Sequence, residues 1–407
     1  MDNYINFNNI ANCTHCGSCK ASCPTYSEEP RELMSARGRV ALLQAFSRGE
    51  LKASSRFYES LFSCLLCEAC NKSCPLGINI ADAIYKGRKI LRSFDKKRFL
   101  VNHLLNIAIR NPAVSFKLLK VFRVLSNVPY AHRFPPFGSI KRLGIKEAVR
   151  PFRSEITVFR AQQTIGRIAI FTGCVINYIF PSYGMSLLNV LNTVGYDVIL
   201  PAAEVCCGAP MLESGMEESA ARMAEINMET FKNLNVEAII GLCPTCIHFI
   251  RNVYKRLVGD ALDNVLEISE FFSKRLPISS FNNSKFFNKE LPAKSNLKAM
   301  YHDPCHSKYS LNLYNEPRNI LKSAGVNLLE PSEAGCCGSG GAFGLFYGGL
   351  SEGMLQNRLE AYKAADVIIT SCPNCIIQLK SGIKERRVMH IIEIIEKIFV
   401  KDQNMRW

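Results

Sequence analysis

Cysteines at fixed spacings dominate this 407-residue sequence, and thiolates are soft ligands for zinc and iron–sulfur clusters. The second half of the chain carries two copies of one pattern: a single cysteine, a Cys-Cys-Gly triplet and a Cys-Pro-x-Cys motif. The single cysteine and the Cys-Cys-Gly triplet are 32 residues apart in the first copy and 31 in the second. The triplet and the Cys-Pro-x-Cys motif are 36 residues apart in the first copy and 35 in the second. The pattern is therefore an internal repeat. The first copy contains Cys174, Cys206, Cys207, Cys243 and Cys246, and the second contains Cys305, Cys336, Cys337, Cys372 and Cys375.

The remaining cysteines form two runs near the N-terminus, each with the spacing Cys-x2-Cys-x2-Cys-x3-Cys-Pro. In bacterial ferredoxins with this spacing, the fourth cysteine of each run ligates the other cluster. Structural zinc normally uses two separated pairs of ligands, which fits these runs poorly. We therefore predict two [4Fe-4S] cubanes, one on Cys13, Cys16, Cys19 and Cys74 and one on Cys64, Cys67, Cys70 and Cys23.

Each five-cysteine set offers one thiol more than a cubane or a structural zinc ion needs. Adjacent cysteines fit poorly on one tetrahedral ion but can bridge neighbouring irons, so we predict that each set holds one cluster of unusual geometry. Zinc in one set and redox-active thiols without metal stand as alternatives. His302 and His306 flank Cys305, where they would either tune a cluster and relay protons or hold the cysteine turn.

Two other features near the cysteines have simpler interpretations. His248 follows Cys246 closely and is expected on the surface of a helix. The glycine-rich segment 338–341 is followed by no Walker lysine, so we predict a turn that wraps a cluster rather than a phosphate site. The sequence contains no dinucleotide-binding fingerprint, and a flavin or nicotinamide is therefore expected on another chain.

Length and composition indicate a globular protein of two or three domains with ordinary cores. The hydrophobic fraction is 48%, and no apolar run is long enough to cross a membrane. The first residues lack the basic and apolar regions of a signal peptide, so we expect a cytoplasmic protein whose cysteines stay reduced.

The net charge of +15 is concentrated in one segment. Residues 92–153 hold 14 Lys and Arg against two acidic residues, whereas residues 154–407 balance to zero. Apolar residues at helical spacing predict amphipathic helices around 104–109 and 116–125. These helices either pack on a neighbouring domain or form a face for a membrane surface or a partner protein. Nucleic acid is not expected as a partner, because no matching fold signature accompanies the basic segment.

Hydrophobic periodicity predicts helices over 32–50 and 54–70, and from about residue 165 strands and helices that alternate twice. Each cysteine group of the repeats follows a strand, at the sheet edge where open α/β folds bind ligands. The first copy has predicted strands at 167–171, 197–200 and 237–241 and helices at 183–194 and 217–233; the second has strands at 297–301, 326–329 and 366–370 and helices at 316–324 and 351–365.

The fold class that follows is multidomain α+β, with an α-helical ferredoxin domain before two α/β cysteine-rich repeats. About 40 residues separate the two cysteine runs, too many for a minimal β-hairpin ferredoxin. The expected domains are residues 1–91 with the two ferredoxin motifs, 92–160 with basic connecting helices, 161–275 with the first repeat and 290–407 with the second.

The sequence resembles a known family along nearly its whole length. Segments 13–26, 35–39 and 64–70 resemble the iron–sulfur subunit of glycolate oxidase and of related lactate and glycerol-3-phosphate dehydrogenases. The Cys-Cys-Gly repeats resemble the cysteine-rich domains shared by those subunits and by the heterodisulfide reductase catalytic subunit. The cysteine spacing is specific, whereas the substrate is not specified. Both terminal Cys-x-x-Cys pairs are intact here, although many glycolate-oxidase-type subunits have lost part of theirs, which favours the heterodisulfide-reductase-like branch.

The resemblance implies an electron-transfer subunit of an oxidoreductase complex. Its partner would be an FAD-containing dehydrogenase of a 2-hydroxy acid such as glycolate or lactate, and a quinone or another acceptor would take the electrons. The family also implies non-cubane clusters on the five-cysteine sets. The alternative is a catalytic subunit that reduces a disulfide at such a cluster. A cytoplasmic location, either free or peripheral on the inner face of the membrane beside a quinone-reductase partner, fits both interpretations.

Overall fold

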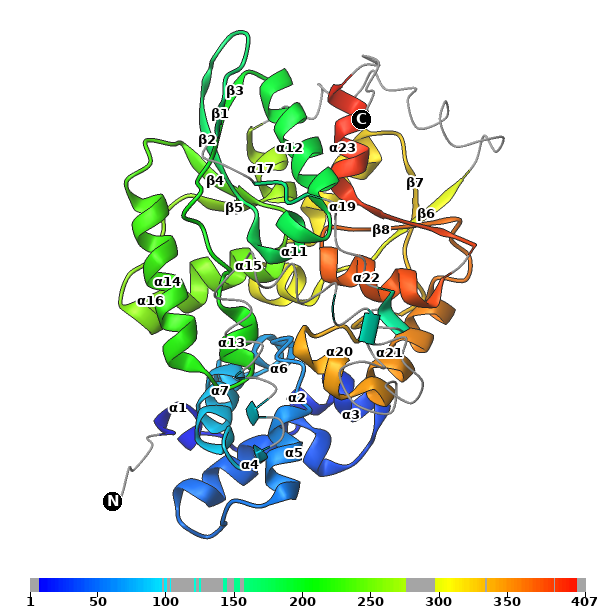
Figure 1. The fold of residues 1–407 in the computed structure, drawn as a ribbon. Helices are drawn as coiled ribbons and strands as arrows, with labels where there is room; N and C mark the ends of the chain where they lie inside the picture. Colours follow the sequence, from blue (N-terminus) through cyan, green and yellow to red (C-terminus); the bar gives the residue numbers. More distant parts are fainter. Residues whose placement is uncertain are drawn as a thin grey trace. The chain divides into compact units, whose positions relative to one another are not determined.

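The computed structural model describes residues 7–96, 99–100, 103, 121, 124–125, 142–144, 150–153, 157–275, 297–333, 335–383 and 385–400 (Figure 1). The two amphipathic helices predicted within 92–153 lie outside the described residues, apart from isolated positions. The chain divides into two compact units. The first contains residues 1–142, 208–220 and 335–357, and the second contains residues 143–207, 221–334 and 358–407.

Helices and turns make up the described part of the first unit, drawn largely in blue and cyan in Figure 1. Three of its longer helices begin at polar caps: the side chains of Ser35, Ser54 and Asn79 accept hydrogen bonds from backbone N–H groups of the first turn. The elements are α1 (Asn8–Ala11), α2 (Ser18–Ala21), α3 (Pro24–Glu28), η1 (Glu32–Met34), α4 (Ala36–Ser47), α5 (Ser55–Phe62), α6 (Ala69–Lys72), α7 (Ile80–Leu91), α13 (Ala209–Glu213) and α20 (Ala342–Phe346).

The helix predicted over 54–70 is wrong in its second half. Helix α5 ends at Phe62, and residues 63–68 turn before α6 begins at Ala69. Leu66 and Glu68 have φ angles of 54° and 61°, which an α-helix cannot contain. The cysteine run therefore replaces helix with a turn. The helix predicted over 32–50 is confirmed for α4 and is preceded by the short η1.

Two mostly parallel sheets form the second unit, one in each repeat. The five-stranded sheet has the order β1-β3-β2-β4-β5, in which only the β1–β3 pair is antiparallel. The four-stranded sheet is parallel throughout, with the order β7-β6-β8-β9. The strands are β1 (Thr157–Phe159), β2 (Gly166–Phe171), β3 (Tyr196–Leu200), β4 (Ala238–Gly241), β5 (Val265–Glu267), β6 (Lys298–Tyr301), β7 (Asn327–Leu329), β8 (Val367–Thr370) and β9 (Arg387–His390).

All six predicted strands of the repeats are confirmed within one or two residues, as β2, β3, β4, β6, β7 and β8. The four predicted helices are confirmed as α12 (Pro181–Thr193), α14 (Glu217–Lys232), α19 (Asn315–Ser323) and α21 (Gly348–Ala361). Elements that the periodicity did not indicate complete the repeats: β1, β5, β9, α11 (Gly173–Tyr178), α15 (Pro244–His248), η3 (Phe249–Val253), α16 (Tyr254–Val258), α17 (Ile268–Arg275), η5 (His306–Ser310), α22 (Pro373–Gly382) and α23 (Ile391–Phe399).

One hydrophobic core joins the two repeats within the second unit. Helices α12 and α23 pack together, and their buried faces include Leu187, Leu191 and Ile395. The core continues onto both sheets through fully buried residues such as Ile170 and Ile369. Because the strands that precede the cysteine groups run parallel within each sheet, their carboxyl ends gather at one edge, and this is where the cysteine loops begin.

Candidate metal centres

The two N-terminal cysteine runs share an unusual backbone path. The second residue after the first cysteine is left-handed in both runs, at His15 (φ 55°) and Leu66 (φ 54°). The residue after the second cysteine is also left-handed, at Gly17 (φ 87°) and Glu68 (φ 61°). A left-handed conformation costs a non-glycine residue about 1–2 kcal/mol, so its recurrence needs a compensating interaction. A group bound by both runs would supply that compensation.

A serine pair connects the two runs just before their fourth cysteines. Ser73 Oγ donates a 2.9 Å hydrogen bond to Ser22 Oγ, and helices α2 and α6 contact each other beside this bond. Cys23 and Cys74 follow these serines directly. The fourth cysteine of each run therefore lies next to the place where the two runs meet, as it must if it ligates the cluster of the other run.

The structure contains a hollow that matches one of the two predicted cubane sites. Cys23 from the first run lines it together with Cys64, Cys67 and Cys70 from the second. The rest of its wall is mainly apolar, from residues such as Leu65 and Ile84, except that Thr25, Arg39 and Glu68 also contribute. Burial raises the pKa of Cys64 and of Cys70, so these sulfurs become thiolates readily only when a cation is bound.

The other predicted cubane ligands are more accessible to solvent. Cys16 is exposed, whereas Cys13, Cys19 and Cys74 are partly buried. Cys13, Cys16 and Cys19 lie close enough to interact, and burial followed by these neighbouring sulfurs raises the pKa of Cys19 to about 11. The hydroxyl of Ser18 lowers the pKa of Cys16. The assignment of Cys74 to this set remains a prediction.

The five cysteines of the first repeat form a connected group in the second unit. Cys174 is hydrogen-bonded to Cys206, and Cys246 to both Cys207 and Cys243. Cys243 is the N-cap of α15 and Cys246 lies one turn later, so the motif presents both sulfurs on one side of the helix N-terminus. The hydrogen bonds from Cys246 and Cys372 lower the pKa of Cys243. The structure therefore brings the predicted set together.

A buried ion pair holds the loop of Cys174 in place, and sequence reasoning missed it. Glu204 accepts hydrogen bonds from the backbone N–H of Thr172 and Gly173, at 3.1 and 2.8 Å, and from the Thr172 hydroxyl. Arg153 lies 3.3 Å from the same carboxylate, and both side chains are buried. Gly173 is left-handed, and a Cβ there would lie 3.1 Å from Cys246 Sγ. A carboxylate two residues before a Cys-Cys pair was the available signal.

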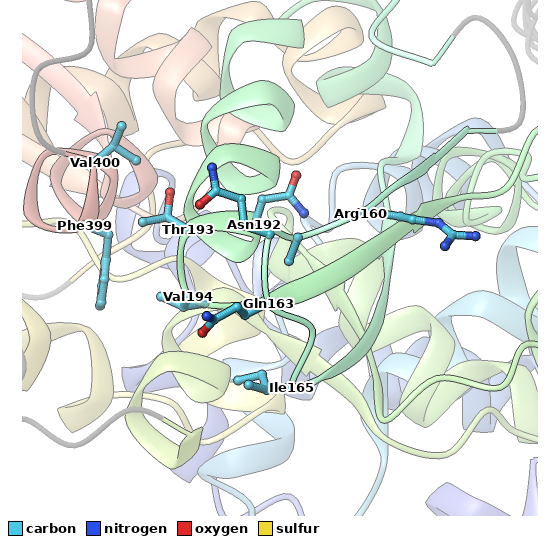
Figure 2. A pocket seen from close by; sticks show the side chains of 11 residues that line it. Arg160, Gln163, Ile165, Asn192, Thr193, Val194, Phe399 and Val400 are labelled. Atoms are coloured by element: carbon cyan, nitrogen blue, oxygen red, sulfur yellow. The ribbon is translucent and has the colours of Figure 1, made fainter.

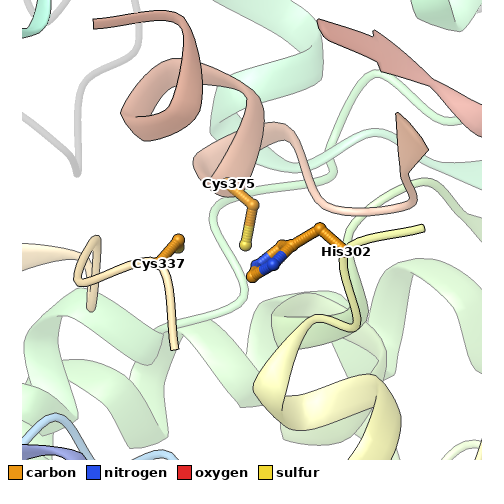
Figure 3. Close-up of side chains that lie close together, drawn as sticks. All are labelled: His302, Cys337 and Cys375. Atoms are coloured by element: carbon orange, nitrogen blue, oxygen red, sulfur yellow. The ribbon is translucent and has the colours of Figure 1, made fainter. Parts of the chain in front are cut away.

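The second repeat provides a related arrangement. Cys372 is the N-cap of α22 and is hydrogen-bonded to Cys375, as Cys243 is to Cys246. Cys372 is also hydrogen-bonded to Cys243, so the Cys-Pro-x-Cys motifs of the two repeats meet. A ring nitrogen of His302 lies within 4.8 Å of Cys375 Sγ (Figure 3). The other side of the ring is fixed by a 2.7 Å hydrogen bond between Nδ1 and the Tyr362 hydroxyl.

The remaining cysteines of the second set stand at three positions. Cys305 is partly buried at the start of η5. Cys336 is also partly buried and accepts a hydrogen bond from the backbone N–H of Gly338 at 3.3 Å, and Cys337 is buried. Cys336 and Cys337 belong to the first unit and Cys305 to the second, so a cluster on the complete second set remains a prediction.

His248 does not lie on a helix surface, and that expectation was wrong. Its side chain is buried, with the ring stacked on His306 at 4.7 Å between centroids. Asn252 bonds to His248 Nδ1, and Thr245 bonds to His306 Nδ1, each at 3.0 Å. The two histidines follow cysteines of different repeats, so their burial comes from the contact between the repeats. For His306 the structure shows a structural hydrogen bond.

A cavity of about 650 Å³ lies at the opposite end of the first sheet from the cysteines (Figure 2). Arg160, Gln163 and Ile165 line it from the segment before β2, and Asn192 and Thr193 line it from the segment before β3. Since both segments precede parallel strands, the cavity lies at their amino ends, whereas open α/β sheets bind ligands at the carboxyl ends. It is not the cysteine site.

The thiol groups fit iron–sulfur clusters. The donors are soft sulfur atoms, four of them face a common hollow, and matching left-handed turns surround both N-terminal runs. No helix among the described residues is long and apolar enough to span a membrane.

Comparison with protein families agrees with this geometry. The model of the 4Fe-4S dicluster domain matches residues 9–78, and the CCG cysteine-rich domain matches residues 168–251 and 299–380. The first match covers both N-terminal runs. The second matches each five-cysteine repeat separately.

Three relatives illustrate the range of similar proteins. The probable glycolate oxidase iron-sulfur subunit of Bacillus subtilis is 28% identical, over 95% of this chain and 93% of its own. A fumarate reductase (CoM/CoB) subunit of Methanothermobacter marburgensis is 28% identical, over 98% of this chain and 75% of its own. Lactate utilization protein A of Exiguobacterium is 26% identical, over 56% of this chain and 97% of its own.

Proposed function

Because the chain is an iron–sulfur protein with a 4Fe-4S dicluster domain and two CCG cysteine-rich domains, we propose that it transfers electrons within a flavin-dependent dehydrogenase complex. The dehydrogenase would oxidise a 2-hydroxy acid of the glycolate or lactate type. Electrons would pass through this chain to a quinone or another acceptor. The names of two relatives, a glycolate oxidase subunit and a lactate utilization protein, support this substrate class.

One observation carries the proposal. Cys23 lines the same hollow as Cys64, Cys67 and Cys70, although 41 residues separate it from the nearest of them. A fourth ligand supplied by the other run is the arrangement of two neighbouring cubanes. Two clusters in sequence serve the passage of single electrons, whereas one structural metal would need no such exchange.

The cofactors in this proposal are two [4Fe-4S] cubanes and one or two non-cubane clusters. Iron–sulfur clusters, when bound, accept and donate single electrons at potentials that their surroundings set. The protein's part is to supply thiolates, exclude water and balance charge. Glu204 and Arg153 hold the loop of Cys174, and Tyr362 orients His302 toward Cys375.

The proposed partner is an FAD-containing subunit. A 2-hydroxy acid gives up two electrons as a hydride equivalent, while a cluster takes one, so a flavin is the ordinary converter between them. This chain has no dinucleotide fingerprint, which supports a flavin on a separate chain. Binding of the complex to a membrane surface is part of the same proposal.

A second candidate is a disulfide reductase that works at a five-cysteine site. The contact between Cys243 and Cys372 supports it, since it places Cys-Pro-x-Cys thiols from both repeats next to each other. The similarity to a fumarate reductase (CoM/CoB) subunit also shows that similar proteins are not limited to the glycolate type.

The experiment that separates the candidates starts from anaerobically purified full-length protein. Iron and sulfide counts and graded reduction followed by EPR would establish the clusters, and two cubane signals are expected. The reduced protein is then mixed with menadione or with cystamine. Rapid reoxidation by the quinone with no effect of the disulfide supports electron transfer. Reoxidation by cystamine alone supports the reductase, and absence of cubane signals refutes both cluster assignments.

A further inference from the structure

Arg39 is a buried cation whose hydrogen bonds, among the described residues, go to a carbonyl, two hydroxyls and a cysteine sulfur. Its exposed fraction is 0%, yet arginine is rarely buried completely without a charged partner. Its guanidinium donates to the carbonyl of Ser60 at 2.7 Å and to the hydroxyls of Thr25 and Ser63 at 3.0 and 3.3 Å. Within the described residues, it forms no salt bridge with a carboxylate.

The remaining contact of Arg39 indicates where its counter-charge belongs. Its Nη1 lies 3.8 Å from Cys23 Sγ, and the side chain lines the hollow with Cys23, Cys64, Cys67 and Cys70. A cubane with four thiolates is anionic. An anionic group in this hollow would give the buried guanidinium its missing partner, and the guanidinium would in turn offset the negative charge on the cluster.

Arg88 is a second buried cation, in contact with the backbone of the same cysteine run. It is 4% exposed and donates to the carbonyl oxygens of Leu61, Phe62 and Cys64 at the end of α5, and to that of Glu213. Its Nη2 donates to the Cys64 carbonyl at 2.5 Å, so the charge of Arg88 lies beside this cysteine. Arg88 also caps a helix end, so its removal would disturb more than charge.

The other predicted cubane site has no comparable cation among the described residues. Arg37 lies near its run, with Nη1 3.4 Å from the carbonyl of His15, but it is partly exposed. Glu32 binds it through two hydrogen bonds, at 2.8 and 3.0 Å, and also binds Lys20. Paired and solvated charges of this kind have little net field. The two cysteine sets are thus alike in spacing and different in electrostatics.

We propose that Arg39, assisted by Arg88, selectively raises the reduction potential of the cluster on Cys23, Cys64, Cys67 and Cys70. Reduction adds one negative charge to a cluster, and a buried cation beside it favours that charge more strongly than solvent-screened cations do. Within the dicluster domain, this cluster is therefore the one that is reduced first, and Arg39 is the residue that sets this order. This inference rests on the proposed pair of cubanes.

The test is an EPR-monitored redox titration of full-length protein, with Arg39→Gln as the main variant. Gln removes the charge and keeps a hydrogen-bonding side chain. We expect at least a tenfold lower ratio of reduced to oxidised cluster at a given ambient potential, equivalent to a shift of about 59 mV for one electron. One cubane signal should shift and the other should not. Cys16→Ser, which alters the exposed ligand of the other set, identifies the unshifted signal.

Two controls separate charge from structure. Arg39→Lys keeps the charge and loses most of the hydrogen bonds, so it should restore much of the potential. Arg37→Gln removes a cation from the same helix that is already paired with Glu32, and it should leave both potentials nearly unchanged. Equal potentials for Arg39→Gln and wild type, with both signals present, overturn the inference, and so does a low potential in Arg39→Lys equal to that of Arg39→Gln. Absence of a second cubane signal from wild type overturns the cluster assignment itself.

Discussion

Gly338, directly after the Cys336–Cys337 pair, offers a sharp test of how closely the cysteine turn is packed. Its φ is 81°, and a Cβ added there would lie 2.5 Å from the carbonyl oxygen of Ser351. Real Cβ contacts essentially never fall below 3.0 Å, so Gly338→Ala requires the backbone to move by about half an ångström. Both segments belong to the first unit.

The expected loss of stability has two parts. The left-handed conformation costs alanine about 1–2 kcal/mol, and forced overpacking against backbone typically adds about 1–3 kcal/mol. Gly49→Ala is a matched control in the same unit, with φ 75° and no atom within 4 Å of the added Cβ. It should show only the conformational cost. Since the effect of alanine on the unfolded chain is common to both variants, their difference of about 2 kcal/mol reports the clash alone.

Gly208, the matching glycine of the first repeat, lies between these extremes. Its φ is 89°, and a Cβ would lie 3.2 Å from the carbonyl oxygen of Ala220. A shift of a few tenths of an ångström relieves this contact. Gly208→Ala should therefore fall between Gly49→Ala and Gly338→Ala in stability.

Urea unfolding of the anaerobic full-length variants, followed by circular dichroism and by cluster absorbance, measures this order. Iron content of the purified proteins gives an independent readout. The reasoning is refuted if Gly338→Ala and Gly49→Ala lose the same stability and retain the same iron, because the turn would then have room for a methyl group.

Three further predictions use the second unit and the thiols. Burial raises the pKa of Glu267 to about 7, so the folded state keeps a proton that the unfolded state releases. The free energy of unfolding therefore falls by about 3 kcal/mol as pH rises from 4.5 to 7. The stability of Glu267→Gln relative to wild type should increase across that pH range, and a difference that does not change with pH would contradict this. Arg153→Met leaves the buried carboxylate of Glu204 without its cation, so it should lower stability by about 3–5 kcal/mol and reduce the iron bound by the first repeat. As a control, Lys232→Met removes one partner of the exposed pair with Asp260 and should change stability by less than about 1 kcal/mol. Chelation of iron under anaerobic, denaturing conditions should release eighteen thiols reactive with Ellman's reagent, since every cysteine is free of disulfides; a lower count would indicate disulfides.

Much of the architecture could be predicted because its signals are local. Residues 168–171 of strand β2 are a continuous apolar run that is buried on both faces, and such runs are typical of parallel sheets. The same holds for β4 and β8. Strands β5 and β9 escaped prediction because neither is followed by a cysteine group, the landmark after each of the six predicted strands.

The helix predicted over 54–70 failed for a different reason. Propensity favours helix through Leu65 and Leu66, but the backbone there turns left-handed at Leu66 and Glu68. This path matches that of the first run, where glycine makes part of it easier. Tertiary interactions override local preference at this site, as is common where strain accompanies function.

The sequence by itself determined the chemistry of this protein: which thiols are present, how they repeat and that each repeat cysteine follows a strand. Spacing is a covalent property and needs no fold to be read. Only the tertiary structure decided which of them meet and what surrounds them. The contact of Cys243 with Cys372, the burial of His248 against His306 and the buried charge of Arg39 all depend on segments far apart in the chain. Such contacts follow from packing, to which residue order gives no local signal.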